Sequence, residues 1–115
     1  IRFNNLPGVG ETVYLIGKGG PSANGITLGV ARDGGGTLQL DCWIDATNYQ
    51  RAFAFATNTW YNLCVDRLGS ATNNVKLFVD GTRQGLSISD NASISNGSDI
   101  YIANGDFAGL DGWFE

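Results

Sequence analysis

The stretch from Thr59 to Gly81 limits the fold more than any other part of the sequence. Its first arm, residues 60–66, is rich in aromatic and β-branched residues, which fit a half-buried strand. Its second arm, residues 75–79, alternates apolar side chains with others, as a strand with one buried face does. Small polar residues join the arms, and Asp80-Gly81 is a dipeptide that accepts positive φ in a two-residue turn. We therefore predict an antiparallel hairpin followed by a tight turn.

The other segments also predict strands. Residues 12–16 are a nearly continuous apolar run of strand length, residues 26–30 alternate, and further strand patterns cover residues 51–55 and 100–103. No window has a helical period, so the expected fold class is all-β. Alternation over residues 37–45 assigns two faces, one with Leu38, Leu40, Cys42 and Ile44, the other with Thr37, Gln39, Asp41, Trp43 and Asp45.

Length and composition exclude several classes of function. A chain of 115 residues is expected to form one domain. Its net charge of −4 provides no basic surface for nucleic acid, and no apolar run reaches the roughly 20 residues of a membrane-inserted helix. The chain has no histidine, which excludes a Ser-His-Asp triad, a Cys-His pair and imidazole zinc ligands.

Cys42 and Cys64 lie in expected strands, and the sequence leaves two states open for them. If their strands are neighbours, the thiols can form a disulfide; otherwise both are expected to be buried and free. Asn91-Ala92-Ser93 and Asn96-Gly97-Ser98 match the glycosylation acceptor pattern, which Asn- and Ser-rich loops also produce by chance.

Short motifs over most of the chain resemble laminin-G-like domains, which belong to the concanavalin-A-like lectin and glucanase superfamily. The matching segments are Trp60 to Asp66, Val75 to Gly81, Tyr101 to Gly105 and Phe107 to Asp111, with looser matches at residues 15–19 and 26–30. The resemblance implies that residues 1–115 form one antiparallel jelly-roll sandwich of two sheets. It also implies that Trp60 lies in the core.

The two ends of the sequence, Ile1 to Phe3 and Trp113 to Glu115, both read as incomplete strands. Sandwiches of the resembled family usually pair their first and last strands. We therefore expect a fragment or module of a longer protein, with a sheet that lacks terminal strands. A bare sheet edge recruits another strand, so we expect strand pairing with a missing segment or another chain.

Glucanases of the same superfamily carry acidic residues at alternate positions of one strand. The best match here is residues 109–115, but Gly109 stands where the nucleophile would be. Asp111 and Glu115 are about 13 Å apart along an extended strand, against the roughly 5–10 Å that glycoside hydrolysis needs. Asp41 and Asp45 have the same spacing. We therefore expect no enzyme, and a glucanase remnant is the least favoured alternative.

The resemblance implies one candidate metal site, for calcium at the rim of the sandwich. Its ligands would be the carboxylates of Asp45 and Asp90 and the carbonyl of Ile88, an oxygen set that suits a hard cation. The alternative is that both aspartates are solvated loop residues.

Carbohydrate binding would use an exposed ring on which a sugar stacks its apolar face. The candidates are Trp43, Tyr49 and Trp113, each of which alternatively serves in packing. The expected function is a non-catalytic extracellular or cell-surface recognition module, of lectin or cell-adhesion type, binding glycan or protein at the loop rim. The alternative is a structural or assembly module of a surface protein or filament, completed by strands from a neighbouring chain.

Overall fold

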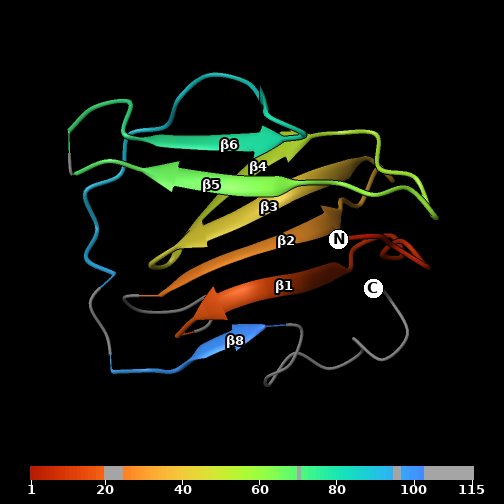
Figure 1. Ribbon diagram of the computed structural model, residues 1–115, viewed down its shortest axis with the longest axis horizontal. Helices are drawn as coiled ribbons and strands as arrows, with labels where there is room; N and C mark the ends of the chain where they lie inside the picture. Colours follow the sequence, from red (N-terminus) through yellow and green to blue (C-terminus); the bar gives the residue numbers. More distant parts are fainter. Residues whose placement is uncertain (20–24, 70, 95–96, 103–115) are drawn as a thin grey trace.

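Two antiparallel β-sheets make up the computed structural model, which describes residues 1–19, 25–69, 71–94 and 97–102 (Figure 1). The larger sheet has the strand order β4-β3-β2-β1-β8 and the smaller one β5-β6-β7. No helix in the described part of the chain is long and apolar enough to cross a membrane. The strands are β1 (Thr12–Lys18), β2 (Ile26–Arg32), β3 (Leu38–Ile44), β4 (Thr47–Ala52), β5 (Leu63–Arg67), β6 (Val75–Val79), β7 (Thr82–Arg83) and β8 (Ile100–Ile102).

Alternation in the large sheet separates an inner face from an outer one. Leu40, Cys42 and Ile44 of β3 are fully buried against the small sheet, as the sequence predicts. In β1 a bulge between Tyr14 and Ile16 shifts the register against β2. Opposite this bulge, a Cβ on Gly29 would lie 2.4 Å from the carbonyl oxygen of Val13. Only glycine therefore lets β1 approach β2 so closely here.

The small sheet confirms the predicted central hairpin. β5 pairs with β6 from Leu63↔Val79 to Arg67↔Val75, and the inward side chains of β6 are almost completely buried. Asp80 and Gly81 have φ of 51° and 74°, the two left-handed residues of a type I′ turn. These dihedrals match the twist of the flanking strands, so β7 folds directly back onto β6.

The first residues of the chain pair with the segment that precedes β5. The N–H of Tyr61 donates to the carbonyl of Ile1 at 2.8 Å, and the Ile1 amino group donates to the carbonyl of Tyr61 at 2.9 Å. This pairing turns Phe3 and Tyr61 inward, where they meet Phe53 and Phe55 with ring centroids 4.7–6.2 Å apart. An aromatic cluster thus closes one end of the sandwich.

Two strand expectations are wrong, one in its register and one in its bounds. Trp60 is 64% exposed, with the Arg2 guanidinium 5.9 Å from its ring, and the core aromatic is its neighbour Tyr61. A one-residue offset moves every side chain of a strand to the opposite face, which explains the error. The strand expected over residues 51–55 ends at Ala52, because a two-residue turn starts β4 already at Thr47.

The two cysteines lie in different sheets and are both free. Cys42 in β3 is buried, which raises the pKa of its thiol to about 12. Cys64 in β5 is exposed, so the expectation of two buried thiols holds for Cys42 and is wrong for Cys64.

The turn at Gly81 gives a test of the hairpin. A Cβ on Gly81 meets no atom within 4 Å, so Gly81→Ala introduces backbone strain without a steric clash. We expect the variant to lose about 1–2 kcal/mol of unfolding free energy, the cost of a left-handed conformation for an L-residue. Gly35→Ala is the control, because Gly35 has no positive φ and should change stability by less than about 0.5 kcal/mol. Urea unfolding measures both, and equal losses would contradict the turn assignment.

Candidate functional site

The outer face of the large sheet carries a group of polar and aromatic side chains that we call the Asp41 cluster. Cross-strand pairing builds it: Asp41 lies opposite Gln50 on β4 and Gly29 on β2, and Gly29 lies opposite Tyr14 on β1. The next row pairs Trp43 with Asn48 and Thr27. The cluster therefore consists of Tyr14, Thr27, Asp41, Trp43, Asn48 and Gln50.

Asp41 is the buried anchor of this cluster, with no exposed surface. Its Oδ1 accepts a hydrogen bond of 2.8 Å from the Gln50 side-chain amide. No hydrogen bond of good geometry reaches Oδ2 from the described residues. Burial raises the pKa of Asp41, and the nearby donors of Gln50, Asn48 and Trp43 moderate that rise. The carboxylate thus fixes the Gln50 amide through Oδ1, while Oδ2 has no such bond among the described residues.

Tyr14 and Trp43 form the aromatic part of the cluster. Both rings are half-buried. Tyr14 lies directly opposite Gly29, which has no side chain, and Trp43 lies two residues along β3 from Asp41, the other neighbour of Gly29. Burial and then the charge of Asp41 raise the pKa of Tyr14, while the nearby Trp43 indole lowers it. Beneath the rings, the hydroxyl of Thr27 is fully buried and has no hydrogen-bond partner in the described part of the chain.

The surface above the buried anchor carries exposed amides and partly exposed rings. Asn48 and Gln50 are exposed, whereas Trp43 and Tyr14 show part of their rings. Amides can donate to and accept from neutral hydroxyl groups, and a partly exposed ring offers an apolar face. This set of groups suits a neutral, polyhydroxylated ligand. Asp41 is the one carboxylate among the six residues that define the cluster.

The other two aromatic residues predicted to bind a sugar, Tyr49 and Trp113, are not in the Asp41 cluster. Tyr49 points to the inner face, packs against the core, and donates from its hydroxyl to Oδ2 of Asp90 at 2.6 Å. Burial and this hydrogen bond raise the pKa of Tyr49 to about 12. Trp113, like Gly109, Asp111 and Glu115, lies outside the described residues.

The rim residues predicted for calcium have other contacts. The Asp90 carboxylate accepts from Tyr49 and from the N–H of Ala92, and its Oδ1 lies 3.3 Å from the Arg67 guanidinium. The carbonyl of Ile88 accepts from the N–H of Val75. Asp45 lies in the β3–β4 turn with φ of 54°. Within the described ranges, no three Cys, Asp or Glu side chains gather as a metal-ion site would require.

Calcium binding at Asp45, Ile88 and Asp90 therefore stays a prediction. An ion would have to replace the donors that now occupy Asp90. Arg67 already neutralises this carboxylate, and it also donates to the carbonyls of Asp90 and Ala92. Asn74 holds the same segment by exchanging side-chain hydrogen bonds with the Asp90 backbone at 2.6 and 2.9 Å.

The comparison with known families gives one match. A laminin-G family model, described as the concanavalin A-like lectin/glucanases superfamily, matches residues 1–114. No curated protein and no solved structure matches the chain significantly.

The buried Asp41 makes a prediction about pH. Because burial raises its pKa above the ordinary 3.8, the folded protein keeps this proton at pH values where the unfolded chain has lost it. Stability therefore falls as the pH rises from the ordinary pKa through the raised one. We expect Asp41→Asn to remove this fall, so that its unfolding free energy exceeds that of the parent at about pH 7 and approaches it at about pH 3. Urea unfolding across this range tests it, and a variant that is less stable at neutral pH would contradict it.

The hydrogen bond from Tyr49 to Asp90 makes a second prediction. Tyr49→Phe should lower the unfolding free energy by about 1.5–3 kcal/mol, as loss of a hydrogen bond to a buried charged group does. Tyr101→Phe is the matched control, since Tyr101 is 40% exposed at the edge strand β8. Thermal or urea unfolding of both variants measures the difference. Equal stability of the two would mean that Asp90 does not depend on this hydroxyl.

Proposed function

The chain belongs to the concanavalin A-like lectin/glucanases superfamily, and we propose that it is a non-catalytic recognition module that binds carbohydrate on the outer face of its large sheet. The observation that carries this proposal is the fully buried Asp41, which fixes the exposed Gln50 amide beside a second exposed amide and two half-buried rings. We propose an extracellular or cell-surface setting, in which such modules act in adhesion.

A sugar has two kinds of surface, apolar ring faces and polar hydroxyl groups, and the outer face offers a partner for each. The apolar face of a pyranose ring can stack on the exposed part of Trp43 or Tyr14. Its hydroxyl groups can pair with the amides of Asn48 and Gln50, which both donate and accept. The hydrogen bond from Gln50 to Asp41 fixes the orientation of one amide before any ligand arrives. Pre-orientation lowers the entropy cost of binding.

The same cluster argues against glycoside hydrolysis. That reaction uses two carboxyl groups roughly 5–10 Å apart, flanking the scissile bond. The cluster contains Asp41 alone, and this carboxylate is covered by its neighbours and not open to a substrate. A group in this position can orient other side chains but has no access to an anomeric carbon. This supports a binding role without catalysis.

We place the carbohydrate site on the outer face of the large sheet and not at the loop rim, where the sequence analysis expected it. At the rim, Arg67, Tyr49 and Asn74 already occupy the polar groups of the Asp90 segment. On the outer face, the Asn48 and Gln50 side chains remain exposed. We propose calcium, if it binds at Asp45, Ile88 and Asp90, as a stabiliser of the rim and not as a ligand to the sugar. Chelation should then leave carbohydrate affinity unchanged.

A titration with soluble oligosaccharides tests the proposed function. A panel of neutral and acidic oligosaccharides is screened by calorimetry, and the best binder is titrated into the parent chain and into Asn48→Ala and Trp43→Phe. We expect each variant to weaken binding by about tenfold, or about 1.4 kcal/mol. Trp60→Phe is the matched control, because Trp60 is exposed outside the cluster and should leave the affinity unchanged.

Two outcomes would contradict the proposal. The first is that no oligosaccharide in the panel binds at millimolar concentration. The second is that a sugar binds but Trp60→Phe weakens it as much as Trp43→Phe does. Because Asn48 is exposed, loss of folding is not expected to explain a loss of affinity in Asn48→Ala.

A further inference from the structure

One edge of β5 has no partner strand among the residues that the structure describes. The direction of its backbone groups follows from its ends. The carbonyl of Asn62 accepts from Asp80, and the N–H of Leu68 donates to Asn74, so even-numbered residues bond toward β6. In an antiparallel ladder this direction alternates. The N–H and C=O groups of Leu63, Val65 and Arg67 therefore point to the opposite, unpaired edge.

Just before β5, the backbone on the same side as this edge is already paired within the chain. Tyr61, two residues before Leu63, exchanges both of its backbone hydrogen bonds with Ile1. The pairing is antiparallel, with Arg2 opposite Trp60. A strand pairing with Leu63, Val65 and Arg67 would continue this ladder in the same direction. The unpaired edge of β5 thus lies in line with the antiparallel pairing between Ile1 and Tyr61.

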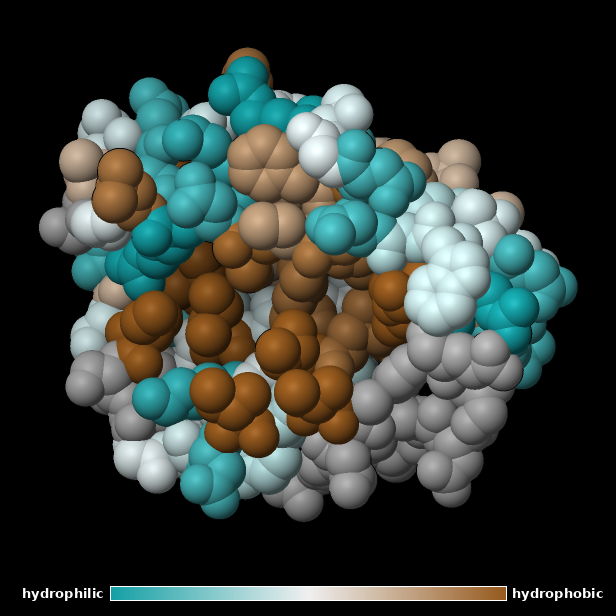
Figure 2. Space-filling view, in the orientation of Figure 1, coloured by the Kyte–Doolittle hydropathy of each residue, from teal (hydrophilic) through white to brown (hydrophobic). Residues whose placement is uncertain are grey.

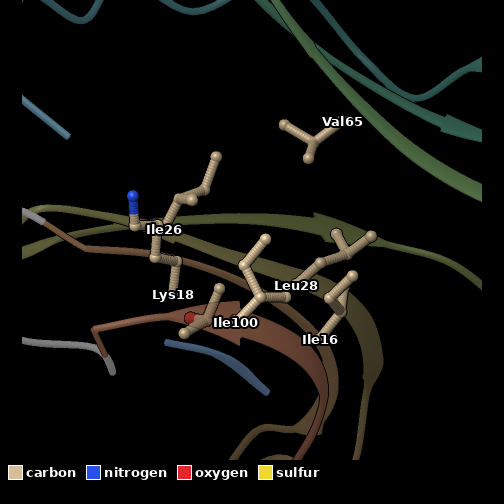
Figure 3. Close-up of a pocket in the computed structure, with 8 residues that line it drawn as sticks. Ile16, Lys18, Ile26, Leu28, Val65 and Ile100 are labelled. Atoms are coloured by element: carbon tan, nitrogen blue, oxygen red, sulfur yellow. The ribbon is translucent and has the colours of Figure 1, made fainter. Parts of the chain in front are cut away.

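An apolar groove lies directly beside this edge, between the two sheets. Figure 3 shows Val65 of β5 facing Ile16, Ile26, Leu28 and Ile100 of the large sheet across the groove. Ile16, Ile100 and Ile102 are 42%, 66% and 70% exposed. Figure 2 shows the apolar side chains gathered in this hollow. The small sheet lies over β3 and β4, whereas Ile16 of β1 and the side chains of β8 stay exposed (Figure 1).

We propose that this groove and the β5 edge together bind one extended polypeptide segment, antiparallel to β5, with apolar side chains at alternate positions. Side chains of Leu63 and Val65 turn inward, so the residues opposite them in a bound strand would also turn inward. Those inward residues would rest on Ile16, Ile26 and Leu28, while their N–H and C=O groups bond to β5. The surface for this segment is separate from the Asp41 cluster on the outer face.

Other occupants would not match both the backbone groups of β5 and the apolar groove. A small apolar molecule would leave the backbone groups of β5 unpaired, and the groove volume of about 220 Å³ is small for a typical ligand site. A second copy joined edge to edge through β5 would bring its own large sheet into the space of β1 and β8, which extend past β5 (Figure 1). The net charge of −4 favours a segment with basic flanks.

The test uses synthetic peptides of about nine residues, alternating valine and threonine with a lysine at each end. In one derivative the valines are N-methylated, which removes the N–H groups aimed at β5. In the other the threonines are N-methylated, which removes only groups aimed away from it. Fluorescence anisotropy should show that the threonine derivative binds like the parent peptide and that the valine derivative binds at least about tenfold more weakly. Amide exchange at Leu63, Val65 and Arg67 should slow on binding.

Protein variants test the same surface from the other side. Val65→Pro removes an N–H that faces the open edge and leaves the hydrogen bonds to β6 in place, as proline on an edge strand can. Ile16→Asp places a charge in the groove at a residue that is already 42% exposed. Both should weaken peptide binding at least about tenfold, whereas Asp66→Asn, on the outward side of β5, should not.

The proposal is overturned if the two N-methylated peptides bind equally, if no peptide binds, or if binding leaves amide exchange along β5 unchanged. If Val65→Pro does not fold, the peptide pair and Ile16→Asp still decide the question. Failure here would leave oligosaccharide binding on the outer face untouched, because Ile16 and Val65 take no part in the Asp41 cluster.

Discussion

The pairing of β3 between β2 and β4 is the constraint on which both faces of the molecule depend. It fixes Leu40, Cys42 and Ile44 toward the small sheet and Asp41 and Trp43 away from it. A shift of one residue would bury a carboxylate in the apolar core and expose three core side chains. The large cost of that exchange holds the register. Core and candidate site are therefore two consequences of one ladder.

The two proposed surfaces differ in how they would gain binding energy. The outer face offers oriented amides and ring faces, where hydrogen-bond matching gives selectivity. The β5 edge offers backbone groups beside exposed isoleucines, where any strand with apolar residues at alternate positions gains ladder hydrogen bonds and apolar burial. One surface thus selects by side-chain chemistry and the other by backbone geometry. They lie on opposite sides of the large sheet, so both can be occupied together.

Much of the fold could be predicted from local pattern, because alternation and turn residues are short-range signals. The hairpin, the turn at Gly81 and the two faces of β3 follow from residues close in sequence. Trp60 was misplaced because the N-terminal pairing that sets its register is a long-range contact. The cluster was missed in part because the Asp45 turn moves β4 toward the N-terminus and sets Gln50 opposite Asp41. The Asp45-Ala46 turn lacks the glycine that usually marks a two-residue hairpin, so the local sequence gives little sign of that pairing.

Side-chain NMR during an oligosaccharide titration can show whether a sugar binds over Asp41, as we propose. The indole N–H of Trp43 and the side-chain amides of Asn48 and Gln50 report on the cluster, while those of Trp60 and Asn73 report on surfaces outside it. If a sugar binds over Asp41, saturable shifts are expected at the first three signals and none at the last two. Shifts confined to Asn73, or spread equally over both groups, would contradict it.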